Sequence, residues 1–139
     1  MHTMEKALSM VDTTIGKKIV MALSGIVLFG FVVGHMLGNL QIFIGPKTFN
    51  DYSAFLHGNP TMIWMARGVI GLSAGLHLWS AASLWLTNRA ARPHRYAKHR
   101  HVATSYAART MIWTGPIVAL YIAYHLAHLT FGVTDGLGY

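Results

Sequence analysis

Residues 15–43 read IGKKIVMALSGIVLFGFVVGHMLGNLQIF, and this stretch decides the fold. No Lys, Arg, Asp or Glu stands between Lys18 and Lys47. At about 1.5 Å per residue, a helix of this length is ample to cross a hydrocarbon core of roughly 30 Å. The stretch therefore predicts a transmembrane helix.

Two further apolar stretches follow the first one. The second covers about residues 62–87 with one charge, Arg67, near its start. The third covers about residues 110–132 and is uncharged, with Pro116 in its first turns, where a lost backbone donor matters least. The sequence therefore predicts an all-α bundle of three transmembrane helices, in a single domain over residues 1–139.

The composition agrees with a membrane protein. The chain is 53% hydrophobic and only 11% charged, and it has no cysteine, which excludes disulfides, thiolate metal sites and iron–sulfur ligation within it. A cleavable signal peptide is not evident in the polar N-terminus. The net charge of +7 could attract nucleic acid, but the basic residues stand beside the apolar stretches, where they set orientation in a lipid membrane. We therefore expect no nucleic acid partner.

The basic residues are unevenly distributed among the connections. The connection between the first two helices has only Lys47, balanced by Asp51. The N-terminal flank and the connection between the second and third helices hold Lys6, Lys17, Lys18, Arg89, Arg92, Arg95, Lys98, Arg100 and Arg109. Because positively charged flanks remain in the cytoplasm, we expect a cytoplasmic N-terminus and an external C-terminus.

Each predicted helix carries a histidine well inside: His35, His77 and His125. An ionisable side chain in hydrocarbon costs free energy unless something binds it. One such histidine could form an interhelical hydrogen bond, but one in each of three helices indicates a shared ligand, and haem iron is the leading candidate. His128 competes with His125, because it lies almost one turn further along the same helix.

Counting along the helices separates the histidines by depth. At about 1.5 Å per residue, His35 lies about 27 Å beyond Lys17, and His125 lies about 24 Å beyond its own basic flank. His77 lies about 18 Å before Arg89, one to two turns shallower. We therefore expect His35 and His125 to hold one haem near the outer face. His77 would bind a second haem nearer the cytoplasm, and its partner ligand is not in these three helices.

Small residues stand near two of the histidines. Those on the helix face of His77 are Ser73, Ala74, Ser80 and Ala81. Others in the first two helices are Gly30, Gly34, Gly38, Gly71 and Gly75. The set around His77 predicts a groove for a flat macrocycle, whereas spaced glycines are more typical of close helix packing.

A family resemblance is carried by Gly34-His35-Met36-Leu37-Gly38-Asn39-Leu40 followed by Asn50-Asp51-Tyr52, by Gly75-Leu76-His77 with Asn88-Arg89, Ala91-Arg92-Pro93 and Tyr96, and by Arg109-Thr110-Met111, Gly115, Tyr124-His125-Leu126 and His128. In this order, and over almost the whole chain, they resemble one known family. That family is the single-chain, two-haem cytochrome b membrane anchor of bacterial succinate dehydrogenases and fumarate reductases.

The resemblance implies a haem-b-binding electron-transfer subunit of a succinate:quinone oxidoreductase that crosses the bacterial inner membrane several times. It implies His35 and His125 as axial ligands of the distal haem, and His77 as one ligand of the proximal haem. The implied partners are a flavoprotein and an iron–sulfur subunit on the cytoplasmic side, with menaquinone as the substrate. The anchor itself would be non-catalytic. Assembly of the complex into a higher oligomer stays an open alternative.

The resemblance has one departure. The family usually has five helices, the fourth of which supplies the second proximal ligand, and this chain offers three. A fragment of a longer protein, a second membrane chain, or a proximal haem that is absent or differently ligated would each account for the difference.

Other side chains could contact haem or quinone. Arg67 could snorkel outward or face a haem propionate or a quinone, whereas Arg109, Arg100 and Arg89 suit propionates of a cytoplasm-side haem. A quinone that exchanges protons needs a titratable group, so the quinone-site candidates are Asp51, Asn50, Tyr52, His57 and His128. For His57 a solvated position is the better expectation. His94, His99 and His101 would be solvated or contact a partner subunit.

Two alternative functions stay open. One is a di-haem cytochrome b anchor of another respiratory enzyme, such as a formate dehydrogenase or a hydrogenase. The other is a haem-free structural membrane protein that uses histidines to join helices. The resemblance is compatible with either direction of the reaction, succinate oxidation or fumarate reduction.

Overall fold

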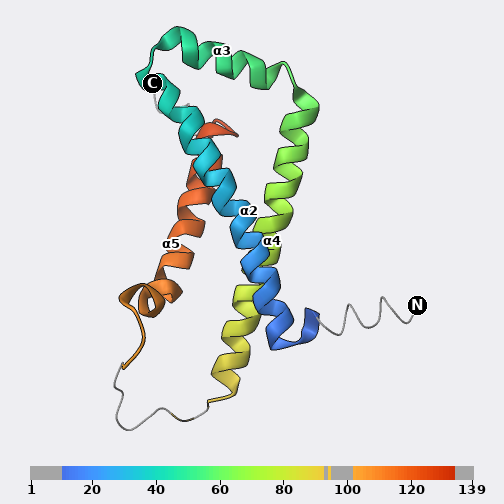
Figure 1. Ribbon diagram of the computed structural model, residues 1–139, viewed down its shortest axis with the longest axis vertical. Coiled ribbons are helices and arrows are strands. Elements are labelled where there is room, and N and C mark those ends of the chain that lie inside the picture. Colours follow the sequence, from blue (N-terminus) through green and yellow to red (C-terminus); the bar gives the residue numbers. More distant parts are fainter. Residues whose placement is uncertain (1–10, 93, 95–101, 134–139) are drawn as a thin grey trace, which may run out of the picture. The chain divides into compact units, whose positions relative to one another are not determined.

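The computed structural model describes residues 11–92, 94 and 102–133, and the described part of the chain is helical without a strand (Figure 1). Its elements are α2 (Thr14–Leu40), the short 3-10 helix η1 (Gln41–Phe43), α3 (Pro46–His57), α4 (Pro60–Ala90) and α5 (Tyr106–Leu129). Three spans are long and apolar enough to cross a membrane: Thr14–Phe43, Pro60–Ala90 and Tyr106–Leu129. The predicted all-α fold with three membrane-crossing helices is confirmed.

The chain forms two compact units, one over residues 1–95 and the other over residues 96–139. The first contains α2, η1, α3 and α4, and the second contains α5. The prediction of a single domain concerns the packing of one unit on the other, and it stays a prediction.

The helix ends follow local capping chemistry. The Thr13 hydroxyl accepts a hydrogen bond of 3.0 Å from the backbone N–H of Gly16 at the start of α2. Pro60 occupies the first turn of α4, where a missing N–H costs little. The Ser105 hydroxyl accepts from Ala108 N–H at 3.2 Å and starts α5 four residues earlier than predicted.

This early start corrects the expected position of Pro116. The predicted helix has Pro116 in its first turns, whereas the structure places Pro116 inside α5. A proline there removes one backbone hydrogen bond from the helix interior and crowds the carbonyl one turn earlier.

In the first unit, α2 and α4 run antiparallel and pack against each other. In Figure 1 the two ribbons lie closest away from α3 and spread apart toward it. The buried side chains of the described residues in this unit are few and mostly small: Ser24, Ser73, Ser80 and Leu84. Small side chains allow the two helix backbones to approach closely.

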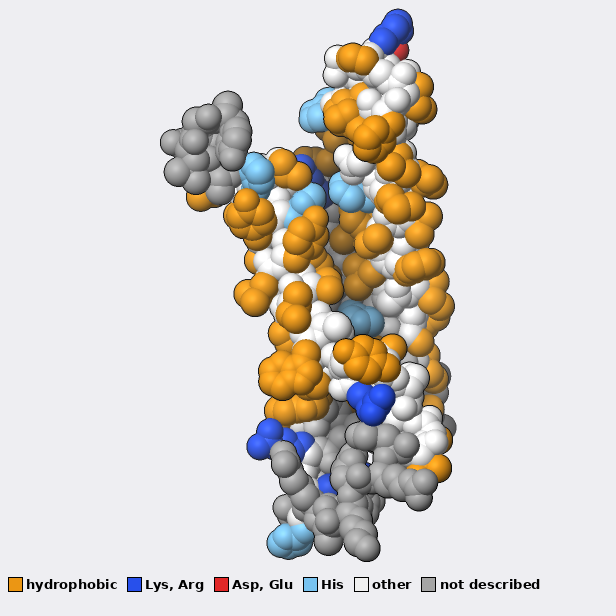
Figure 2. All heavy atoms as spheres, turned by 90° about the vertical axis from the view of Figure 1, so that its left-hand side faces the viewer, with side chains coloured by type: hydrophobic (Ala, Val, Ile, Leu, Met, Phe, Trp, Pro, Cys, Tyr) orange, Lys and Arg blue, Asp and Glu red, His pale blue; other side chains and the backbone are white. Residues whose placement is uncertain are grey.

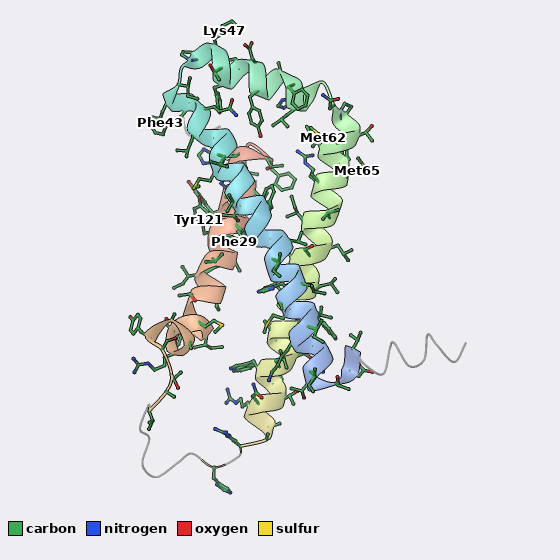
Figure 3. All side chains as sticks on the ribbon, viewed as in Figure 1. Phe29, Phe43, Lys47, Met62, Met65 and Tyr121 are labelled. Carbon is green, nitrogen blue, oxygen red and sulfur yellow. The ribbon has the colours of Figure 1, made fainter. Side chains whose placement is uncertain are left out.

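The large apolar side chains point outward instead. Figure 2 shows hydrophobic side chains over much of the visible helix surface. Phe43 is 85% exposed, and the sticks of Phe43 and Met65 project away from the helices in Figure 3. An apolar exterior around a small, partly polar interior is the arrangement expected of helices surrounded by lipid or by further helices.

The connection between the first two spans contains the helix α3, which was not predicted from the sequence. Gly45 separates η1 from α3 with a φ of 147°, a conformation that favours glycine, and Pro46 then begins α3. The partly buried residues of α3 recur at helical spacing and are Phe49, Tyr52, Ser53 and Leu56. This face points toward the spans, so α3 covers the end where they diverge.

Candidate functional site

His77 lies where α4 packs against α2. Its ring nitrogen Nδ1 is 3.1 Å from the backbone carbonyl oxygen of Met21 and 3.3 Å from the hydroxyl oxygen of Ser24. Gly25 makes room for the ring, because a Cβ atom added there would stand 3.3 Å from His77 Cε1. One turn of α2 therefore supplies both the hydrogen-bond partners and the space for this imidazole.

These contacts determine which nitrogen of His77 carries the proton. The Met21 carbonyl can only accept a hydrogen bond. The Ser24 hydroxyl is directed at backbone carbonyls of its own helix, 2.7 Å to Val20 and 3.1 Å to Met21, so its oxygen is left to accept from the ring. Both partners thus call for a proton on Nδ1 of His77, assigned from the hydrogen-bond network.

A neutral imidazole with its proton on Nδ1 has an unprotonated Nε2. That nitrogen can bind a metal, and a second-shell hydrogen bond from the other nitrogen to a carbonyl is usual for metal-bound histidines. The contacts of His77 therefore suit an axial haem ligand. The same contacts also form the interhelical hydrogen bond that the haem-free alternative requires.

The contact between His77 and α2 fixes the relative levels of two histidines within the first unit. His35 follows Met21 by 14 residues and Gly25 by 10 residues. At 1.5 Å per residue, His35 therefore lies about 15 to 21 Å further toward α3 than His77. The order of the levels agrees with the prediction, but their spacing is about twice the predicted one.

The larger spacing has a simple cause. The prediction measured depth from Lys17 and from Arg89 as if these two residues were level. In the structure the Lys17 ammonium lies 5.8 Å from the ring centroid of Trp79, which precedes Arg89 by ten residues. The basic flank of α4 thus extends beyond that of α2, and His77 lies closer to Lys17 than predicted.

His35 projects from the half of α2 that is nearer to α3 and is exposed. Its ring stacks on Phe31, one turn earlier, with centroids 5.3 Å apart and planes inclined by 22°. The Asn39 amide donates a 2.8 Å hydrogen bond to the His35 carbonyl, which holds the backbone at this level. Nearby Gly38 is buried against Tyr52 of α3, whose hydroxyl oxygen would stand 2.7 Å from an added Cβ.

The small residues near the histidines divide into two groups. Ser73 and Ser80 are buried, so on their side of α4 small size serves close packing, while Ala74 and Ala81 remain partly exposed. An added Cβ would meet no atom within 4 Å at Gly30, Gly34, Gly71 and Gly75. Close packing therefore explains Gly25 and Gly38, but these four glycines have no such contact in the described residues.

The two histidines of α5 belong to the second unit. The His125 ring stacks on Tyr121 with centroids 5.8 Å apart, and the His128 ring is tilted against Tyr124 at 5.7 Å. Each histidine therefore packs on a tyrosine of its own helix. The pairing of His125 with His35 involves both units and stays a prediction.

Of the four arginines predicted near a cofactor, Arg100 lies outside the described residues, and the other three lie over aromatic rings. The Arg89 guanidinium is 5.3 Å from the ring centroid of Trp85. The Arg67 guanidinium is 5.0 Å from the ring centroid of Trp64, and that of Arg109 is 5.9 Å from Tyr106. Arg67 precedes His77 by ten residues on the antiparallel helix, which places it about 15 Å toward α3, near the level of His35. This level is compatible with both predictions for Arg67, a side chain that snorkels outward and one that faces a haem propionate or a quinone.

The quinone-site candidates of the first unit lie on α3. Asp51 and Asn50 are exposed, and the Asp51 carboxylate forms an ion pair of 2.6 Å with Lys47. Tyr52 points back to α2 at Gly38, so the structure does not bring it together with Asp51 on one face. His57 is exposed, with Nδ1 2.8 Å from the Ser53 carbonyl oxygen.

Several predicted residues lie outside the described part of the chain: Lys6, Pro93, Arg95, Tyr96, Lys98, His99, Arg100 and His101. His94 is described and is exposed. Within the described ranges no three or more His, Asp, Glu or Cys side chains gather into a group that could hold a metal ion. His35 and His77 stand on different helices and at different levels.

Three neighbours of His77 were not predicted from the sequence: Met21, Ser24 and Gly25. Met21 contributes a backbone oxygen, which no side-chain pattern reveals. The adjacent Ser24 and Gly25 carried a signal, because a polar residue and a small residue interrupt an apolar run where another helix can approach.

Comparison of the chain with protein-family models, curated proteins and solved structures finds no match.

Proposed function

We propose that this protein is a haem-b-binding, electron-transfer anchor subunit of a succinate:quinone oxidoreductase, embedded in the bacterial inner membrane. The single observation that carries the proposal is the pair of hydrogen-bond contacts made by Nδ1 of His77. Its Nδ1 is bonded to the Met21 carbonyl and the Ser24 hydroxyl, so Nε2 is the nitrogen offered to iron. The resemblance of the sequence to the two-haem anchors supplies the identity of the complex.

Two haem levels follow from the proposal. His77 would hold the cytoplasm-side haem, together with a ligand from outside this chain. His35 and His125 would hold the outer haem, with Arg67 near its propionates and Arg109 near those of the cytoplasm-side haem. Bound haem would supply one-electron redox chemistry at potentials that axial ligands, hydrogen bonding and burial adjust.

The levels of His35 and His77 suit electron transfer across the membrane. Two haems held about 15 to 21 Å apart along the helix axis would divide the path of the electrons into shorter steps. An iron–sulfur subunit would dock on the basic cytoplasmic side and connect to a flavoprotein that performs the succinate–fumarate chemistry. Menaquinone would exchange electrons at the anchor, and the candidate residues for this quinone site are Asp51, Asn50, Tyr52, His57 and His128.

A reduced-minus-oxidised absorption spectrum of the complex purified through a tag on this chain tests the proposal. We expect a split b-type α band and co-purification of a flavoprotein and an iron–sulfur protein. A haem signal with different soluble partners would assign the chain to another respiratory enzyme. The absence of any b-type band would reject the electron-transfer role.

A second candidate function is favoured by a specific contact. The hydrogen bond between His77 and the Met21 carbonyl joins α4 to α2 without any ligand, as in a haem-free structural membrane protein. Substitution of His77 separates the two cases. In the structural protein the change loosens the pair of helices, whereas in the haem protein it also removes a b-type signal.

A further inference from the structure

We propose that Ser24 is the positioning residue of His77 and tunes the haem that His77 would bind. This inference rests in part on the proposed function, but its structural half, the control of the imidazole tautomer, does not. Ser24 is only 5% exposed and lies on α2, across the helix interface from His77. Its hydroxyl has no role in the ligand set itself.

The geometry assigns the direction of each hydrogen bond. The Ser24 hydroxyl proton points to the Val20 carbonyl at 2.7 Å, the shortest of its contacts. Its oxygen then accepts from His77 Nδ1–H at 3.3 Å, beside the Met21 carbonyl at 3.1 Å. The proton on Nδ1 is therefore shared between two acceptors of the same helical turn.

A hydrogen bond from Nδ1–H makes the opposite nitrogen a stronger electron donor. Ferric iron gains more from a strong donor than ferrous iron, so the shared hydrogen bond lowers the midpoint potential of a haem bound at Nε2. Removal of the Ser24 hydroxyl leaves one acceptor instead of two. The potential should then rise, and the ring should be held less firmly.

The first experiment compares Ser24→Ala with the wild-type complex in a potentiometric titration of the b-type bands. We expect an upward shift of the potential of the His77 haem only, with the His35 haem unchanged, and retention of the His77 haem weakened by about tenfold. Ser24→Thr keeps the hydroxyl and should restore the wild-type potential.

Ser80→Ala is the matched control. Ser80 is fully buried and lies three residues from His77, but its hydroxyl donates only to the Leu76 and His77 carbonyl oxygens. Loss of this hydroxyl removes a buried hydrogen bond of the same kind without touching the ring. An equal shift of potential in Ser80→Ala and Ser24→Ala would overturn the proposal, as would no shift in Ser24→Ala.

The second experiment reads the tautomer directly and needs no haem. In the full chain labelled with ¹⁵N-histidine, with His77 assigned by its loss in His77→Gln, we expect the nitrogen shifts of an Nδ1–H imidazole. In Ser24→Ala the Nε2–H form should gain population. A wild-type His77 protonated on Nε2 would reject the inference, whereas an Nδ1–H tautomer in a protein without haem would reject only the proposed function.

Discussion

His77 Nδ1 lies 3.1 Å from the carbonyl oxygen of Met21. This hydrogen bond joins α4 to α2 at a level about three to four helical turns further from α3 than His35. The hydrogen bond fixes the register of α2 against α4, and with it the relative levels of two histidines that the sequence alone does not determine. Because the two levels are this far apart along the axis, His35 and His77 are not suited to bind the same iron.

The first prediction concerns the ligand sets. His35→Ala and His125→Ala should each remove the same haem, the outer one, and leave one b-type haem in place of two. His77→Ala should remove the other haem and spare the outer one. Low-temperature spectra and extracted haem content measure both effects. If His35→Ala and His77→Ala abolish the same band, the assignment of two levels is wrong.

The second prediction concerns Gly25. In Gly25→Ala the new methyl group would stand 3.3 Å from His77 Cε1, so the ring must shift by a few tenths of an ångström. We expect about tenfold weaker binding of the His77 haem, measured by titration of haem into the haem-depleted complex. Gly30→Ala in the same helix meets no atom within 4 Å and should leave that affinity unchanged. Equal effects in both variants would contradict the assigned role of Gly25.

Much of the fold could be predicted because it follows from local properties. The length of the apolar run in residues 15–43 and the absence of charge dictate a spanning helix whatever its neighbours are. The helix α3 was missed although Phe49, Tyr52 and Leu56 recur at helical spacing. It is short, and half of its residues are polar, so its formation depends on the spans against which its apolar face packs.

The site was predictable only to the level of the individual histidine. Burial cost identifies His35, His77 and His125 as candidates, because it depends on residue type and depth alone. The level of His77 depends on the register of α2 against α4, which the small residues Ser24 and Gly25 set by close packing. The basic flanks gave a poor reference, since Lys17 lies beside Trp79 and not beside Arg89.

The third prediction concerns the attachment of α3 to α2. A methyl group at position 38 would stand 2.7 Å from the Tyr52 hydroxyl oxygen and 2.9 Å from its ring carbon Cε1. Gly38→Ala should therefore displace Tyr52 and destabilise the docked α3 by about 1–3 kcal/mol. Faster hydrogen exchange across α3 in nanodiscs measures the displacement.

A double-mutant cycle isolates this contact. In a Tyr52→Ala background the atoms that obstruct the new methyl group are gone, so Gly38→Ala should cost far less. We expect a coupling energy of about 0.5–3 kcal/mol between the two positions. Additive effects would show that Gly38 does not act through Tyr52.

The last prediction concerns the orientation of the chain in the membrane. The sequence has no cysteine, so any single cysteine substitution creates a unique thiol for labelling. Thr48 on α3 and His94 are both exposed. Thr48 lies before the second span and His94 lies after it, so the two residues flank opposite ends of α4. Because the basic flanks are expected in the cytoplasm, an impermeant maleimide should label Thr48→Cys in intact spheroplasts and His94→Cys only after lysis.

Ser73→Cys, only 8% exposed at the wild-type position, should stay unlabelled until the protein is denatured. The reverse labelling order for Thr48→Cys and His94→Cys would invert the orientation, place His77 nearer the outer face than His35, and leave the basic residues on the wrong side for a cytoplasmic iron–sulfur partner.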